Sequence, residues 1–300
     1  AHATLWCVRA ARSDRDDLLL AMKEYQLDES DGIPEIALQE IALLRELSHP
    51  NIVSFVDASH EKDSSTIGLI MPLAICDFED VLDACRHSEQ GRPFPLSLLR
   101  PIASQLLSGL EYLHAHRYVH GDVAPSNVAL FPAESSGSNG LQCRLCWIDF
   151  SLSGGKITSV AYRLPYRAPE LVLPSSAHGS RILAHASPAT DCWALGHLLV
   201  ACLFPMYRVY SHSCRDISEL QLQLHRLRDK RSLWVKQVNQ AVPALSDGAA
   251  REVLLGLTDC DVHVRMTARE ACESVWLQDR AGCACLPWSV EDVKQGHFFA

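Results

Sequence analysis

The sequence lacks an apolar run long enough to cross a membrane, and it lacks an excess of basic residues. Its longest apolar run, Trp193 to Phe204, is interrupted by Gly196 and His197, so we expect a buried helix there. A formal net charge of −9 opposes binding to nucleic acid or an anionic membrane, since both need clustered Lys and Arg. We therefore expect neither partner, and no signal peptide before the fold.

Cysteine is plentiful but does not have the density of a disulfide scaffold. Twelve cysteines are scattered over 300 residues, which favours buried thiols in a reducing compartment. We therefore expect a cytoplasmic or nuclear protein. Two close pairs, Cys143 with Cys146 and Cys283 with Cys285, could each supply half of a metal site. A zinc site needs four ligands, so zinc is a minor alternative.

The chain is organised around three polar residues that lie in two short segments. Asp122 and Asn127 lie in the segment YVHGDVAPSN, and Asp149 ends an apolar run in IDFS. In phosphoryl transfer, one carboxylate orients the attacking hydroxyl, while an amide and a second carboxylate hold magnesium on the nucleotide phosphates. On spacing alone, either aspartate could be a surface-turn residue. The two segments resemble the HRDLKPxN catalytic loop and the DFG segment of protein kinases, which implies that Asp122 is catalytic and that Asn127 and Asp149 bind Mg²⁺.

The N-terminal part resembles the smaller lobe of such a kinase. We expect short strands at residues 3–9 and 18–25, the second ending in LAMKE, which is similar to the VAIK strand and places its lysine at Lys23. A helix follows over residues 34–47, with proline in its first turn and apolar residues at helical spacing. It resembles the PSTAIRE helix of cyclin-dependent kinases and places Glu40 where that family pairs a glutamate with the lysine. On position alone, the Lys23 ammonium and the Glu40 carboxylate would both be exposed to solvent.

A nucleotide site is implied by the same resemblance. Ile67 to Met71 is expected to form a strand leading into the link between the lobes. Met71 takes the gatekeeper position, although plain core packing is an alternative for it. The backbone near Leu73 would bond adenine, and Asp77 would lie near the ribose. The resemblance implies ATP as the cofactor, with contacts from Lys23, Cys7, Ala21, Met71, Leu73, Asp77 and Ala129.

The second half of the chain carries further motifs of the same family in the same order. YRAPE, ending at Glu170, matches the end of a kinase activation segment, and DCWALG, beginning at Asp191, resembles the DxWSxG opening of a large buried helix. Arg265 falls where kinases place the arginine that pairs with the glutamate of APE. Residues 96–116 are expected to form the helix that delivers the catalytic loop, and the Ser/Gly-rich residues 132–142 an insertion between two strands.

The resemblance therefore predicts an α+β, bilobal protein-kinase-like fold. Residues 1–73 would form the N-terminal lobe, a small β-sheet with one long helix, and residues 74–300 a mainly helical lobe with the catalytic loop and activation segment. The family's glycine-rich loop is missing or degraded, since its second and third glycines fall on His2 and Leu5. The chain opens with Ala1 rather than methionine, and we expect the first strand of the family to be absent from it.

Three further departures bear on activity. Gly121 replaces the arginine that pairs with a phosphorylated activation loop, so we expect no switching by phosphate at Thr158 or Ser159. Ala124 replaces a lysine that contacts the γ-phosphate, a hydrogen bond worth about 1.5–3 kcal/mol, which slows transfer by about ten- to a hundredfold. Ser151 replaces the DFG glycine, which restricts the backbone but spares the metal ligand.

Three functions remain in competition. Retention of the complete catalytic set favours a Ser/Thr protein kinase resembling the cyclin-dependent kinases of the cell cycle; the set is Lys23, Glu40, Asp122, Asn127 and Asp149. A cyclin-like activator would bind the 34–47 helix, with Ile36 as its exposed anchor; the alternative is that Ile36 packs inside its own lobe. The defective loop and Ala124 favour a pseudokinase scaffold instead. The third alternative is a small-molecule phosphotransferase of the aminoglycoside or choline kinase type, a class that lacks the APE segment and its arginine partner.

Overall fold

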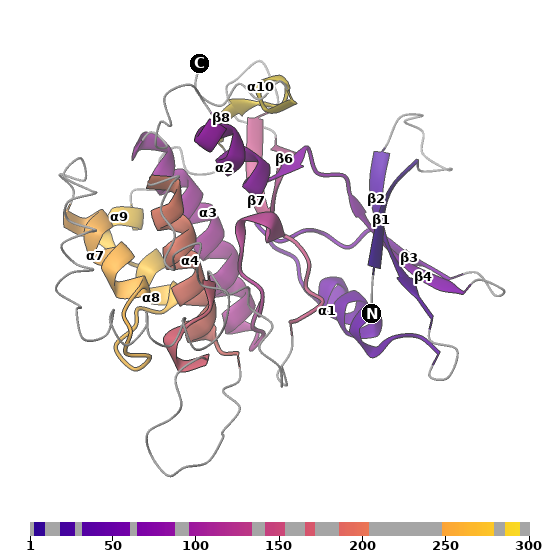
Figure 1. The fold of residues 1–300 in the computed structure, drawn as a ribbon, viewed down its shortest axis with the longest axis horizontal. Coiled ribbons are helices and arrows are strands. Elements are labelled where there is room, and N and C mark those ends of the chain that lie inside the picture. The colour runs from indigo at the N-terminus through magenta and orange to yellow at the C-terminus, as the bar shows by residue number, and fades with distance from the viewer. Residues whose placement is uncertain are drawn as a thin grey trace, which may run out of the picture.

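The computed structural model shows a smaller lobe built on one β-sheet and a larger, mainly helical lobe (Figure 1). The residues that the structure describes are 3–9, 19–27, 32–60, 65–87, 96–133, 142–153, 166–171, 186–203, 248–278 and 286–294. Thr158 and Ser159, at which we expect no switching by phosphate, lie outside these ranges. The expected α+β, bilobal fold is confirmed.

The smaller lobe is an antiparallel sheet with the strand order β1-β2-β4-β3 and one helix packed on it. Its elements are β1 (Ala3–Arg9), β2 (Leu19–Gln26), α1 (Glu35–Glu46), β3 (Asp57–Ser59) and β4 (Thr66–Pro72). Because successive side chains of a strand point to opposite faces, Ala21, Lys23 and Tyr25 of β2 share one face. The chain leaves β4 at Pro72 and enters β5, the first strand of the other sheet, at Cys76.

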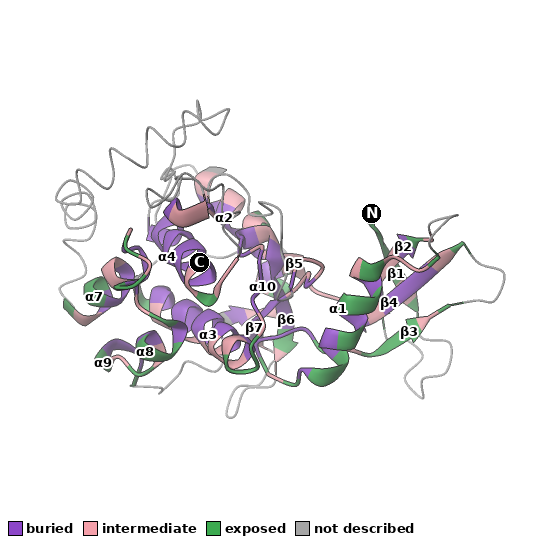
Figure 2. Cartoon of the chain, turned by 90° about the horizontal axis from the view of Figure 1, so that it is seen from below, coloured by how far each residue is buried: buried purple, intermediate pink, exposed green. Residues whose placement is uncertain are grey.

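Helix α1 turns one side to the sheet and the other outward (Figure 2). Its first turn carries Glu35 and its last turn Arg45, an arrangement that complements the helix dipole. Its apolar side packs in the core through residues that include Leu43 and Leu44. Of the two alternatives for Ile36, the exposed anchor is wrong, because Ile36 is half-buried against the core; the exposed large apolar side chain of α1 is Leu38, at 48% exposure.

The larger lobe combines a second sheet, of order β5-β6-β7-β8, with helices around α3 and α4. The strands are β5 (Cys76–Asp77), β6 (Val128–Ala133), β7 (Gln142–Trp147) and β8 (Leu286–Ser289). The helices are α2 (Phe78–His87), α3 (Leu96–Ala115), the 3₁₀ turns η1 (Pro125–Asn127) and η3 (Pro169–Leu171), α4 (Pro188–Leu203), α7 (Gly248–Leu257), α8 (Ala268–Cys272), α9 (Val275–Gln278) and α10 (Val290–Lys294).

Helices α3 and α4 form the centre of this lobe. Ile102, Leu106, Leu110 and Leu113 of α3 are fully buried, as their spacing predicts. The expected buried helix around Trp193 is α4, which is buried from Thr190 to its end at Leu203. Strands β6 and β7 flank the predicted insertion, whose central residues, 134–141, lie outside the described part of the chain. Strand β8, which sequence patterns did not predict, pairs with β7.

Trp147 at the end of β7 joins the two lobes. Its backbone carbonyl accepts from Val53 N at 2.9 Å, and its own amide donates to Asn51 O at 2.9 Å, so the segment after α1 forms a parallel bridge with β7. Its buried indole donates to the carbonyl of Leu106 at 2.9 Å. Gly109 is needed beside it, since a Cβ there would lie 2.6 Å from Trp147 Cδ1. The connection after α1 is therefore fixed to the core of the larger lobe.

None of the described helices is long and apolar enough to cross a membrane. Within the described ranges, no three His, Cys, Asp or Glu side chains are grouped as a metal site would require. Cys143 and Cys146 are buried, and burial raises the pKa of the Cys146 thiol to about 11. Cys283 and Cys285 lie outside the described residues. Cys143 and Cys146 on β7 therefore give no support to a zinc site.

Candidate active site

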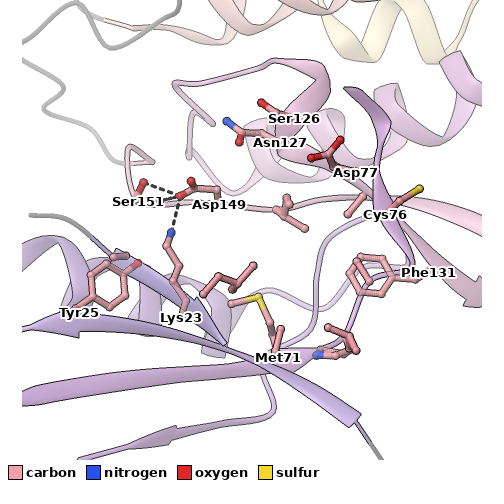
Figure 3. Close-up of a pocket in the computed structure, with 18 of the residues that line it drawn as sticks. Lys23, Tyr25, Met71, Cys76, Asp77, Ser126, Asn127, Phe131, Asp149 and Ser151 are labelled. Atoms are coloured by element: carbon pink, nitrogen blue, oxygen red, sulfur yellow. Dashed lines mark hydrogen bonds and ion pairs between the residues drawn. The ribbon is translucent and has the colours of Figure 1, made fainter. Parts of the chain in front are cut away.

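A cavity of about 600 Å³ lies between the two lobes, and residues of both sheets line it (Figure 3). This volume is in the range of nucleotide-sized ligands. Of the expected nucleotide contacts, Lys23, Ala21, Met71, Leu73, Asp77 and Ala129 all line the cavity. Cys7 does not: it is exposed on β1, where Ala3 and Leu5 supply the lining instead.

Lys23 links three segments of the chain across this cavity. Its Nζ lies 2.9 Å and 3.1 Å from the two carboxylate oxygens of Glu40 on α1, and 2.6 Å from Asp149 Oδ1. Glu40 is 1% exposed, so this ion pair lies in a region of low dielectric where an opposite charge stabilises strongly. The expected pairing of Lys23 with Glu40 is therefore present in the structure.

Asp149 adopts a backbone conformation that is uncommon for residues other than glycine, with a φ of 60°. Burial alone would raise the pKa of its carboxyl group, but the Lys23 ammonium and the Ser151 hydroxyl together hold that pKa below its ordinary value. Ser151 Oγ donates to Asp149 Oδ1 at 2.6 Å. Asp149 is thus an anion, and one of its oxygens already has two donors.

The catalytic loop holds Asp122 and Asn127 against each other. Asn127 Nδ2 donates to the backbone carbonyl of Asp122 at 2.7 Å and to its Oδ2 at 2.7 Å. The 3₁₀ turn η1 places Asn127 there, and Ile148 N donates to the carbonyl of Asn127 at 3.0 Å. Because the amide nitrogen is engaged with Asp122, the side-chain oxygen of Asn127 is the atom that a metal would contact.

Asp191 of α4 anchors the catalytic loop from inside the larger lobe. Its fully buried carboxylate accepts the backbone N–H groups of His120 at 2.8 Å and Gly121 at 3.1 Å, and it lies 2.8 Å from His114 Nε2. Gly121 has a φ of 81°, in the left-handed region that favours glycine. The glycine that replaces the family's arginine is therefore well suited to the local backbone.

The expected ion pair between Arg265 and Glu170 is also present. The two guanidinium nitrogens donate to the two carboxylate oxygens at 2.6 Å and 2.8 Å, and the guanidinium carbon lies 5.0 Å from the centroid of the Trp193 ring. Such a bidentate pair is among the stronger polar contacts in proteins. It joins the YRAPE segment to the connection between α7 and α8, and the contact with Trp193 links that connection to the DCWALG helix.

Among the residues of the site that sequence patterns did not predict are two on β2 and α1. Tyr25 lines the cavity and donates its hydroxyl to Glu40 Oε2, and Ile36 of α1 also lines it. The alternation of β2 places Tyr25 on the face of Lys23, and the expected pairing of Lys23 with Glu40 already brings α1 to that face, so the sequence could have indicated that Tyr25 lies near Glu40. Oxygen donors are the ligands that Mg²⁺ prefers, so Asn127 and Asp149, which line the same cavity, fit such an ion.

A lysine paired with a helix glutamate, facing an Asp–Asn loop across an interlobe cavity, is the arrangement of the protein-kinase class. The sequence pattern of the protein kinase domain matches residues 5–277, and the chain belongs to this family. The resemblance to cyclin-dependent kinases is likewise confirmed. The chain is 28% identical over 287 residues to the cell division control protein 2 homologue 3 of Trypanosoma brucei brucei, covering 87% of this chain and 84% of that protein.

A solved structure agrees with the fold. The chain is similar to a chain in the crystal structure of the yeast RNA Pol II CTD kinase CTDK-1 complex, with a TM-score of 0.69 and 21% sequence identity. The similarity covers 91% of this chain and 93% of that one. It therefore extends over both lobes.

Proposed function

We propose that the chain is an ATP- and Mg²⁺-dependent protein serine/threonine kinase that transfers the γ-phosphate of ATP to a protein hydroxyl. The observation that carries the proposal is the position of Lys23 Nζ, 2.9 Å from Glu40 and 2.6 Å from Asp149, in a cavity also lined by Asn127. A cation held between two carboxylates would be available for phosphate oxygens if Asp149 contacted a metal ion instead. The similarity to a cell division control protein supports the Ser/Thr specificity.

Each polar residue has a separate role in this mechanism. Lys23 grips the α- and β-phosphates, and Glu40 keeps its ammonium pointed into the cavity. Asp149 and Asn127 would hold Mg²⁺, which would supply positive charge to neutralise the phosphates. Asp122 accepts the hydrogen bond of the attacking hydroxyl and aligns it, while Asn127 Nδ2 fixes the Asp122 carboxylate at 2.7 Å.

A pseudokinase scaffold is the second candidate, and Ala124 favours it. Ala124 is fully buried and offers no charge where the family's lysine contacts the γ-phosphate. Ala124→Lys should raise the rate by at most about a hundredfold if the missing lysine limits transfer. No change in rate would show that the missing lysine is not the limiting defect.

The outer side of α1 is our proposed contact for a cyclin-like partner. Leu38 is exposed there, and a buried apolar anchor at the centre of an interface is worth about 2 kcal/mol or more. The related yeast kinase was solved as part of a complex. Leu38→Asp should therefore abolish capture of a cyclin-like protein without unfolding the chain; unchanged capture would exclude this surface.

Two substitutions test the enzyme assignment. Asp122→Asn keeps the shape of the loop but removes the carboxylate that aligns the hydroxyl, so transfer to a Ser/Thr peptide library should fall strongly while Mg-ATP affinity stays nearly unchanged. Asp149→Asn should weaken Mg²⁺-dependent nucleotide binding as well as transfer. Wild-type transfer no greater than that of Asp122→Asn, measured with candidate cyclins present, would leave the pseudokinase scaffold in place of the enzyme.

A further inference from the structure

Tyr25 is a buried aromatic residue with a polar contact that the mechanism above does not use. It is 2% exposed, and its hydroxyl donates to Glu40 Oε2. Burial, together with the neighbouring Glu40 carboxylate, raises the pKa of Tyr25, so the hydroxyl keeps its proton and acts as a donor. Figure 3 shows its ring beside Lys23 at the margin of the cavity.

Glu40 receives donors from three directions. Besides Lys23, the Tyr25 hydroxyl donates to Oε2, and the backbone amide of Phe150 donates to Oε1 at 2.9 Å. A buried carboxylate is costly unless it is paired and its lone pairs are satisfied. Each donor therefore stabilises the inward position of α1, and the Tyr25 hydroxyl comes from the sheet rather than from the far lobe.

Tyr25 also contacts the other member of the ion pair. Lys23 and Tyr25 are two positions apart in β2 and point to the same face of the strand. The Lys23 ammonium lies 5.4 Å from the centroid of the Tyr25 ring, within the range of a cation–π contact. One side chain thus supplies a hydrogen bond to the anion and an aromatic face to the cation.

We propose that Tyr25 is a positioning residue that holds Glu40 against Lys23, so that residues of this chain alone assemble the ion pair that grips the nucleotide phosphates. The inference rests on the proposed function, because it assigns phosphate contact to Lys23. It implies that a partner on the outer side of α1 adds contacts to an ion pair already in place. The sequence signal is a tyrosine two positions after the strand lysine.

The test replaces the hydroxyl and keeps the ring. Tyr25→Phe should weaken Mg-ADP binding about tenfold, since a hydrogen bond to a charged group is lost, while adenosine binding stays unchanged because adenosine has no phosphates. Tyr118→Phe is the matched control: its hydroxyl donates to Glu46 Oε2 on the same helix at 2.9 Å, remote from Lys23, so neither affinity should change. Calorimetric titration measures both ligands, and Tyr25→Leu serves as a second hydroxyl-free variant should the Phe variant not fold.

A double-mutant cycle shows whether Tyr25 acts through Glu40. In the Glu40→Gln background, Tyr25→Phe should add little further loss of Mg-ADP affinity, because the acceptor it serves has already been changed. Additive losses, unchanged Mg-ADP affinity in both hydroxyl-free variants, or equal weakening of Mg-ADP and adenosine would each overturn the inference. Wild-type protein that binds Mg-ADP with this dependence on Tyr25 but transfers no phosphate would overturn the proposed function and leave the inference in place.

Discussion

Arg265 and Glu170 are separated by 95 positions in the sequence and form a bidentate ion pair at 2.6 Å and 2.8 Å. The arginine side chain is fully buried, and its Nε also donates to the carbonyl of Asp259 at 2.8 Å. Within the described residues, this guanidinium donates its hydrogen bonds to groups of the larger lobe. The pair therefore ties the end of the activation segment to that lobe.

Arg265→Lys should lower the free energy of unfolding by about 1–3 kcal/mol, because lysine keeps the charge but cannot reproduce the planar, two-pronged contact. Urea denaturation followed by fluorescence measures the loss. Arg269→Lys is the matched control, since that exposed arginine lies 3.7 Å from Glu111 and should change the stability by less than about 0.5 kcal/mol. Equal losses of unfolding free energy in the two variants would show that the buried ion pair stabilises the fold no more than the exposed contact does.

Gly109→Ala should destabilise the chain by about 1–3 kcal/mol through overpacking. The new Cβ would meet Trp147 Cδ1 at 2.6 Å and the carbonyl oxygen of Asn51 at 2.9 Å, and neither can withdraw without breaking the bridge between the lobes. Gly248→Ala is the control, since within the described part of the chain no atom beyond its chain neighbours and its own helix backbone lies within 4 Å of its Cβ position. Thermal unfolding compares the two; a Gly109 variant as stable as the Gly248 variant would contradict the packing described here.

Ser151→Gly should lower the Mg²⁺ concentration needed for half-maximal nucleotide binding by about fivefold, the effect of about one net hydrogen bond. The Ser151 hydroxyl donates to Asp149 Oδ1 at 2.6 Å, and a metal ion has to compete with that contact. Ser153→Ala is the control, because its hydroxyl donates to the carbonyl of His120 instead. A raised Mg²⁺ requirement in the glycine variant would show that the hydroxyl aids metal binding.

His197 should make the stability of the folded protein decrease in acid. It is fully buried against Trp193, with ring centroids 4.5 Å apart, and burial lowers the pKa of its imidazole from 6.5 to about 3. The unfolded state therefore binds more protons between these values, so this contribution to stability is complete above about pH 6.5 and is lost as the pH falls toward 3. His197→Phe should reduce the slope of unfolding free energy against pH by about one proton in this window. An unchanged slope would rule out His197 as the source.

The sequence predicted the residues whose role depends on a local motif. Lys23, Asp122 and Asp149 lie in strands and loops whose own pattern places them, and the structure brings all three to one cavity or its rim. Helix α1 was predicted, but whether Ile36 faces outward or into its own lobe was left open. Ile36 and Leu38 are about 200° apart around a helix of 3.6 residues per turn, so choosing the outward residue needed knowledge of where the sheet lies.

The remaining features depend on distant parts of the chain. The contact between Tyr25 and Glu40 forms only because α1 packs on β2, and strand β8 forms because β7 offers it an edge. Strand β8 has no periodic or compositional signal in the sequence, and the tyrosine two positions after Lys23 becomes a signal only when α1 is placed against β2. Cys7 was expected to contact the nucleotide but does not line the cavity, for a related reason. Alignment with the family identifies the strand but not how far along the strand the cavity extends.

The carboxylate of Asp191 gives the two halves of the active site different supports. The loop bearing Asp122 is suspended from α4 through His120 N and Gly121 N, whereas Lys23 and Glu40 belong to the sheet and helix of the smaller lobe. A tilt of the smaller lobe would change the grip on the nucleotide while leaving the aim of Asp122 unaltered. Affinity for nucleotide and alignment of the acceptor hydroxyl can therefore evolve, or be engineered, as separate traits.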